Sequence, residues 1–409
     1  MTGDLNKWLR TSLFSLLLVS AIGVVLRYKI SFSLPFIDQK YLLHGHSHFA
    51  FAGWITQALM ALLVNYLSDN GDALAFKRYR FLQYANLITA YGMFISFPIV
   101  GYSFVSILFS TLSIFVSYAF AIQYWRDLSK IKKTVAHAWF KAAIVFNALS
   151  SLGAFSLAFM LATHHFNERF YLGSVYFFLH FQYNGWFFFA CMGLLSNRIV
   201  SLGVSNQRIK NIFSLFFYSS LPAYFLSAPW LQIPNWTYWI VVVSAIAQLV
   251  GWMHLVKSII EIKQVLKQSV GILSFRVFTL VGVALAIKLS LQALSVIPAL
   301  SKLAFGFRPI VVGYLHLVLL GVISLFLINY IVTYTAKLNA HLKAGLMIFI
   351  IGIILNEAAL MIQGISDLYY MPIPQVNIYL FGIAPIIFLG ILLLNTGMRI
   401  SNYDSTHNA

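Results

Sequence analysis

Long apolar stretches separated by short polar segments dominate the chain. Each stretch is about 20 residues long, the length that an α-helix needs to cross the hydrocarbon core of a bilayer. The segments between them carry charges, serine or proline, as at 68–80, 126–138 and 366–374. We therefore expect an all-α integral membrane protein, a single membrane domain over 1–409 with about twelve transmembrane helices. The expected spans are 10–29, 45–67, 81–101, 103–123, 139–162, 170–196, 210–228, 236–259, 273–297, 308–333, 342–364 and 376–397.

The composition agrees with this pattern. Hydrophobic residues make up 60% of the chain and charged residues 9%, whereas soluble domains carry roughly 25% charged residues. The single cysteine, Cys191, excludes a disulfide framework, a paired-cysteine metal centre and a CxxCH haem attachment within the chain. The first apolar stretch, 11–25, is followed by no small-residue cleavage site, so we expect it to be retained.

The distribution of basic residues predicts the orientation. With the amino end inside, twenty of the 27 Lys and Arg residues fall in inner loops and ends, six fall in outer loops, and Lys288 falls within a span. The positive-inside rule therefore places both ends on the cytoplasmic side, in a multi-pass protein of the cell inner membrane. The net charge of +17 is then a topology signal, and lipid rather than nucleic acid is the expected partner.

Three of the predicted spans carry the same short pattern. A histidine is followed five residues later by glycine at His48 and Gly53, at His180 and Gly185, and at His316 and Gly321. The intervals between these histidines each correspond to four spans, and each histidine lies on the second span of its group. The chain therefore divides into three four-helix pseudo-repeats at about 1–135, 136–270 and 271–409, a kind of internal symmetry that shapes the whole fold.

Intramembrane histidines are costly and usually functional. The second span adds His44 and His46 to His48, so that His44 and His48 share one helix face and His46 points nearly the opposite way. Neutral imidazole is a common ligand of haem iron, copper and zinc. We expect His44, His46, His48, His180 and His316 to be metal or cofactor ligands, and their glycines to leave room for a flat macrocycle. Helix packing with hydrogen-bonded imidazoles is the alternative.

Twelve helices, three pseudo-repeats and histidines on helices two, six and ten resemble subunit I of the haem–copper oxidases. The segment His46-Ser47-His48 with Gly53 is also similar to the His-x-His motif of NnrS-type membrane haem–copper proteins, which are linked to nitric-oxide stress. The likeness covers the whole chain as architecture, but as sequence only these short segments. It implies a cytochrome-oxidase-like or nitric-oxide-related oxidoreductase that handles electrons, dioxygen or nitric oxide, served by an electron-donor protein or a quinone.

The resemblance assigns roles residue by residue. His316 and either His48 or His46 match the two ligands of a low-spin haem, and His180 matches the helix that supplies a copper ligand. Two features of the family are missing, because helix ten has Tyr314 where a second histidine would bind the active haem, and 211–228 has no histidine pair for copper. An ordinary proton-pumping oxidase is therefore not expected. One or two b-type haems are expected, and copper stays open.

Two further groups of charged residues invite a function. Arg169 and Arg308 precede helices six and ten on the outer side, where bidentate guanidinium groups suit haem propionates, although interfacial anchoring explains them equally. Lys288 and Glu357 lie at mid-depth on parallel helices and are expected to pair, either as a structural ion pair or as a cytoplasmic proton relay. With Tyr314 they are the candidate catalytic residues.

The main alternative is a haem-free membrane transporter that uses Lys288, Glu357 and the histidines along a substrate path, since transporters also contain internal repeats. The position of the histidines in the outer third of the predicted spans, away from the midplane, favours haem. A third interpretation is an accessory protein that keeps the fold without catalysis.

Overall fold

The computed structural model describes residues 3–231, 234–335 and 338–407, and within them the chain is helical with no strand. Nine helices of this described part are long and apolar enough to cross a membrane, which confirms an all-α, multi-pass membrane protein. These nine are Gly3–Ser31, Gln39–Asp69, Phe104–Leu128, Ala136–Thr163, Asn235–Glu261, Ile272–Leu294, Arg308–Thr333, Ala340–Leu368 and Val376–Met398.

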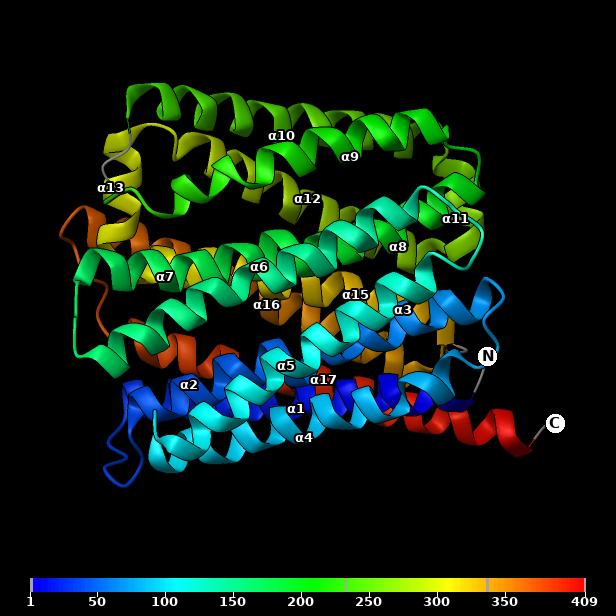
Figure 1. The fold of residues 1–409 in the computed structure, drawn as a ribbon. Coiled ribbons are helices and arrows are strands. Elements are labelled where there is room, and N and C mark those ends of the chain that lie inside the picture. Colours follow the sequence, from blue (N-terminus) through cyan, green and yellow to red (C-terminus); the bar gives the residue numbers. More distant parts are fainter. Residues whose placement is uncertain (1–2, 232–233, 336–337, 408–409) are drawn as a thin grey trace. The chain divides into compact units, whose positions relative to one another are not determined.

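The element order, shown in Figure 1, follows the predicted spans closely. The elements are α1 Gly3–Ser31, α2 Gln39–Phe49, η1 Ala50–Thr56, α3 Gln57–Asp69, α4 Ala75–Val100, α5 Phe104–Leu128, α6 Ala136–Thr163, α7 Glu168–His180, η2 Phe181–Phe187, α8 Phe188–Ser201, α9 Asn206–Ser220, η3 Pro222–Ser227, α10 Asn235–Glu261, α11 Lys263–Val270, α12 Ile272–Leu294, α13 Pro298–Gly306, α14 Arg308–His316, η4 Leu317–Ser324, α15 Leu325–Thr335, α16 Ala340–Leu368 and α17 Val376–His407. The three predicted spans outside the nine fall on α4, on α7 to α8 and on α9.

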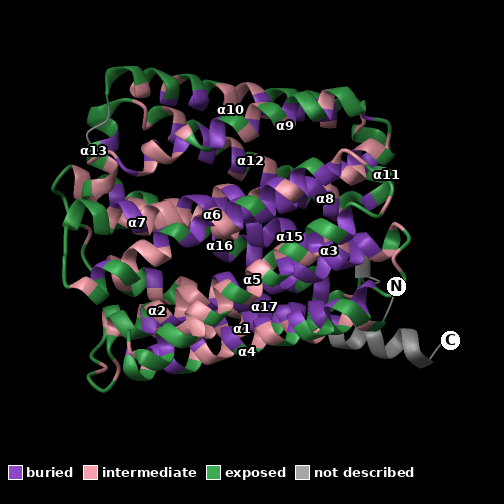
Figure 2. Ribbon diagram, in the orientation of Figure 1, coloured by how far each residue is buried: buried purple, intermediate pink, exposed green. Residues whose placement is uncertain are grey.

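The described helices pack as two compact units, 1–127 with 327–409 and 128–326. These units are defined by packing and do not coincide with three equal repeats. The pseudo-repeats therefore stay a prediction. Figure 2 shows how burial varies among the helices: α3 is buried almost throughout, whereas few residues of α5 are buried. A mostly apolar helix that is buried on all sides, as α3 is, belongs inside a bundle.

In the first unit, α1 and α17 run side by side in opposite directions. Near one end the Asn395 amide donates to the carbonyl of Leu13 at 3.1 Å, and near the other end the Ser31 hydroxyl donates to the carbonyl of Asn377 at 2.8 Å. The first and last helices therefore have the amino and carboxyl ends of the chain on one side, as Figure 1 also shows.

Glycines allow α16 and α17 to approach until their backbones touch. A Cβ placed at Gly390 would lie 2.5 Å from the backbone nitrogen of Phe349, and one at Gly345 would lie 2.8 Å from the backbone nitrogen of Leu394. Small residues at helix contacts are typical of membrane bundles, where van der Waals packing replaces the hydrophobic effect. The sequence pattern of this pair therefore specifies a tight helical hairpin.

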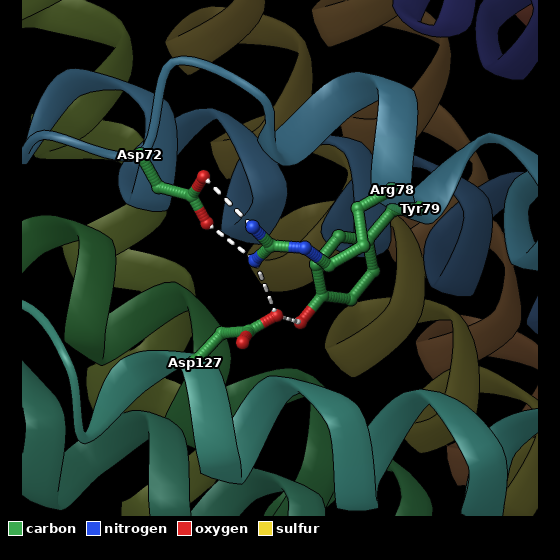
Figure 3. Close-up of polar contacts among 4 residues, drawn as sticks. All are labelled: Asp72, Arg78, Tyr79 and Asp127. Atoms are coloured by element: carbon green, nitrogen blue, oxygen red, sulfur yellow. Dashed lines mark hydrogen bonds and ion pairs between the residues drawn. The ribbon is translucent and has the colours of Figure 1, made fainter.

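A clasp of charged and hydroxyl groups joins three segments of the first unit (Figure 3). Arg78, in the first turn of α4, binds both carboxylate oxygens of Asp72 in the preceding loop at 2.7 and 3.3 Å. It also lies 2.8 Å from a carboxylate oxygen of Asp127 at the end of α5, and the Tyr79 hydroxyl donates to that same oxygen at 3.0 Å. The hydrogen bond to Asp127 is the largest effect on Arg78 and raises the pKa of its guanidinium above the ordinary value.

Candidate cofactor site

Each histidine of the repeated pattern is followed by a π-helical segment. The segment η1 begins two residues after His48, while η2 and η4 begin directly after His180 and His316. Such segments are rare, and where they interrupt α-helices they occur frequently at functional sites. No pattern in the sequence predicted these segments. The three histidines therefore share a local backbone feature in addition to their spacing.

A side chain from the neighbouring helix satisfies a carbonyl within η1. The amide of Asn86 on α4 donates to the carbonyl of Ala52 at 3.1 Å and to the Gln57 side chain at 2.7 Å. Gln57 in turn donates to Gln83, and the side chains of all three polar residues are buried. Because a buried carbonyl without a partner is costly, this amide network stabilises the irregular segment.

His46 lies against α1 in an arrangement typical of metal-binding histidines. Its Nδ1 is 3.1 Å from the carbonyl oxygen of Val19, and a carbonyl only accepts, so Nδ1 carries the proton. The lone pair is then on Nε2, and metal-bound histidines almost always donate their other ring N–H in this way. A Cβ at Gly23 would lie 3.5 Å from Cε1 of the same ring, so the residue of α1 that faces the His46 ring has no side chain.

His44 and His48 contact other residues, on the side of α4. The His48 ring stacks on Phe97 at 4.5 Å between ring centroids, and its Nε2 is 3.4 Å from the Tyr102 hydroxyl. The His44 ring meets the Tyr102 ring edge-on at 4.6 Å. These contacts agree with the expected faces of the helix: His44 and His48 share one, and His46 points the other way.

His180 is a satisfied core histidine in this structure. Its Nε2 donates to the carbonyl of Ser220 at 2.9 Å, and its Nδ1 accepts from the Asn184 amide at 3.1 Å. The residue is 1% exposed. A metal ion could bind His180 only if one of these two hydrogen bonds were broken, which favours the helix-packing alternative at this position.

His316 and Tyr314 lie at the junction of α14 and η4 in the second unit. Both are partly buried, and the Tyr314 ring lies 6.4 Å from that of Tyr183 on η2. The histidines of the second predicted span belong to the first unit. A haem shared by His316 with His46 or His48 therefore stays a prediction, as does a catalytic role for Tyr314.

The glycines five residues after each histidine differ in what surrounds them. A Cβ at Gly53 would overlap the ring of Phe49, and one at Gly185 would lie 2.5 Å from the Cβ of Phe146. At Gly321 it would meet Ala284 and Leu317 at 3.5 and 3.6 Å, which is ordinary contact. The expectation that these glycines make room for a macrocycle is therefore wrong for Gly53 and Gly185, where phenylalanine fills the space.

The charged residues predicted to act together have local partners. The Lys288 ammonium donates to Gln292 at 2.6 Å, and Gln292 donates to Gln248 on α10 at 3.0 Å, forming a buried polar string. Glu357 accepts from Asn356 at 3.0 Å. Lys288 and Glu357 lie in different units, so their pairing stays a prediction.

The remaining sequence-predicted residues lie apart from these clusters. Arg169 and Arg308 are exposed in the first turns of α7 and α14, and their binding of propionates stays a prediction. Among the described residues, no three His, Cys, Asp or Glu side chains come close enough to hold a metal ion together. Cys191 is buried within α8.

Sequence reasoning missed the partners that orient the histidines. Val19 contributes a backbone carbonyl, which no residue pattern reveals, and Tyr102 reaches the histidines only through the turn after α4. The Pro98 and Gly101 pair near that turn was the one available signal. No family model matches the chain, and no curated protein matches it in sequence.

Proposed function

We propose that the chain is a haem-binding, multi-pass redox protein of the cell inner membrane, with twelve crossings in three pseudo-repeats and both ends in the cytoplasm. The nine apolar helices and the antiparallel packing of α1 on α17 support this topology. The excess of basic residues in the predicted inner loops supports the orientation. An electron-donor protein or a quinone supplies electrons, and dioxygen or nitric oxide is the candidate substrate.

The observation that carries the proposal is the geometry of His46. Its Nδ1–H is held by the Val19 carbonyl at 3.1 Å, which fixes the ring and directs the Nε2 lone pair away from that bond. A ligand ring already oriented by a carbonyl loses less freedom on binding a metal. Haem, when bound, supplies one-electron chemistry at its iron.

Within this proposal the chain's own residues hold the cofactor. His46 would bind the haem iron through Nε2, and Val19 would keep the ring in the neutral tautomer that a metal requires. The sequence pattern and the family resemblance name His316 as the second residue that would hold the haem iron. His180 contributes packing, because both of its ring nitrogens already have partners.

A visible spectrum tests the proposal directly. Protein expressed with ample haem and purified in detergent should show a Soret band and sharpened α and β bands on reduction. Acid acetone should extract all of the haem, because the chain has one cysteine and no CxxCH segment. Protein that carries no Soret band under these conditions would rule out the proposed function.

A haem-free transporter is the second candidate, and the string Lys288, Gln292 and Gln248 is the observation that favours it. A buried amine hydrogen-bonded to neutral amides is typical of substrate or proton paths inside membranes. If the transporter interpretation holds, the colourless protein in vesicles should bind or move a solute, and Lys288→Met should abolish this. Haem-loaded protein whose spectrum ignores Lys288→Met would favour the first candidate.

A further inference from the structure

Two histidines on α2 lie on the face opposite His46. His44 and His48 are four residues apart, so their side chains project from successive turns of one helix face. Histidines at this spacing on a helix are a known means of chelating a metal ion. Both rings contact Tyr102, edge-on from His44 at 4.6 Å and by Nε2 of His48 at 3.4 Å from the hydroxyl.

Two close approaches bring Tyr102 to this pair. A Cβ at Gly45, between the two histidines, would lie 2.7 Å from Cγ of Pro98, so α2 and α4 touch at this level. After α4 the chain turns through Gly101, which has a φ of +60° and packs on the ring of Tyr41. Because a φ in that range is costly for other residues, glycine is needed for the turn that carries Tyr102.

The surroundings restrict the histidines further. The Phe97 ring is stacked parallel to that of His48, with an angle of 11° between the planes. The same Phe97 ring packs edge-on against Tyr102 at 5.0 Å. His48 is therefore held between an apolar face and a hydroxyl, and its ring edge with Nε2 is directed to the Tyr102 oxygen. An imidazole restrained in this manner loses little side-chain conformational entropy when it binds a metal ion.

We propose that His44, His48 and the Tyr102 hydroxyl form a site for a late first-row divalent metal ion. Two imidazole nitrogens with one oxygen suit Cu²⁺ and Zn²⁺, and Cu²⁺ binds such donors most strongly. The site is separate from His46, whose ring contacts α1 instead. It therefore does not depend on haem binding, and the two proposals can fail independently.

Metal titration tests the site. The full-length protein, purified with an affinity tag free of histidine, should bind one equivalent of Cu²⁺ and, more weakly, one of Zn²⁺, measured by calorimetry. His44→Ala and His48→Ala should each weaken this binding by at least about tenfold, because loss even of an outer-shell partner of a metal ligand typically costs about 10–100-fold in affinity. His165→Ala is the matched control, because His165 is an exposed histidine in the loop before α7, and it should leave the affinity unchanged.

Two further variants separate the possible results. Tyr102→Phe should weaken Cu²⁺ binding and change its visible absorption, while His46→Ala should change neither. If Ala variants do not purify as a single species, His44→Gln and His48→Gln replace them and should show the same loss. Binding that survives both histidine substitutions, or that His165→Ala removes equally, would overturn the site. Loss of the Soret band in His46→Ala with unchanged Cu²⁺ affinity supports it.

Discussion

At the scale of single residues, hydrogen-bond partners separate histidines that the sequence treats alike. His46 keeps one ring nitrogen available because a backbone carbonyl engages the other, whereas both nitrogens of His180 have partners. The repeated pattern of histidine and glycine is the same at His48 and His180, but the residues around the two rings differ. A place in the repeated pattern therefore makes a histidine a candidate ligand. Whether both of its ring nitrogens already have hydrogen-bond partners then distinguishes a ligand from a packing residue.

The first prediction concerns His46. His46→Ala should remove the haem or convert it to a five-coordinate, high-spin form that reacts with carbon monoxide, because it removes the nitrogen that Val19 orients. His48→Ala should leave the low-spin spectrum in place. The measurement is the reduced visible spectrum with and without carbon monoxide.

His180→Ala is the control for that experiment. It should retain the haem spectrum while lowering stability by about 1–3 kcal/mol, since it leaves the Ser220 carbonyl and the Asn184 amide without their partner. An unaltered low-spin spectrum in His46→Ala would refute the assignment of His46.

The second prediction concerns Asp127, whose side chain is 4% exposed. Asp127→Ala should destabilise the protein by about 1–3 kcal/mol, because the Tyr79 hydroxyl loses its acceptor while Arg78, which is 38% exposed, keeps its bonds to Asp72. Tyr79→Phe should cost about 1 kcal/mol, because it removes one hydrogen bond to the same carboxylate. Thermal unfolding in detergent measures both effects. Glu168→Gln, at an exposed helix start, is the control, and an equal effect there would contradict a role for the clasp.

At the scale of helices, the sequence predicted the spans, which depend on the length of an apolar run. It did not predict the π-helical segments, which depend on one extra residue in a turn. The spans were found because each needs about 20 apolar residues. The π-helical segments η1, η2 and η4 were not, because an extra residue in a turn leaves the apolar run unbroken. The short helices α11 and α13 lie in loops where charge and proline suggested only a break.

The glycines likewise show that a sequence motif does not reveal which of them lie at a close helix contact. The sequence assigned a cofactor role to Gly53 and Gly185, and their space is filled by phenylalanine. The glycines of α16 and α17, which carried no motif, prove to set a helix contact. The atoms that surround each glycine, from its own helix at Gly53 and from a neighbouring helix at Gly185 and Gly390, distinguish these cases.

The third prediction uses two glycines of α17. Gly390→Ala should destabilise the hairpin, because a Cβ there would lie 2.5 Å from the backbone nitrogen of Phe349 and neither helix can yield without separating. Gly382→Ala should be neutral or stabilising by up to about 1 kcal/mol, because no atom lies within 4 Å of a Cβ at that position and alanine favours the helix. Thermal stability of the purified variants measures the difference, and equal effects would contradict the close packing of α16 on α17.

At the scale of the whole molecule, three helical segments decide how many crossings the chain makes in addition to the nine apolar helices of its described part. The α4 helix, the α7 to α8 segment and α9 lie where spans were predicted, but they do not combine the length and apolarity of the other nine. Amide networks account for part of this polarity, as Gln83 and Asn86 on α4 show. Buried polar groups that are paired are tolerated inside bundles, so reduced apolarity does not by itself remove a span.

The last prediction tests these three segments by the side on which their flanking loops lie. The buried Cys191 is the only cysteine, so Cys191→Ser gives a background for single cysteines at exposed positions. If all three segments cross, their two flanks should lie on opposite sides of the membrane. An impermeant maleimide applied to intact cells, with the outer membrane opened where there is one, should label the outer positions at once. It should label inner positions only after the inner membrane is permeabilised.

The outer variants are Phe104→Cys, Phe166→Cys and Trp236→Cys, and the inner variants are Ala73→Cys and Ser205→Cys. Labelling of both flanks of one segment from the same side would show that this segment does not cross, and labelling of Ala73→Cys in intact cells would reverse the proposed orientation.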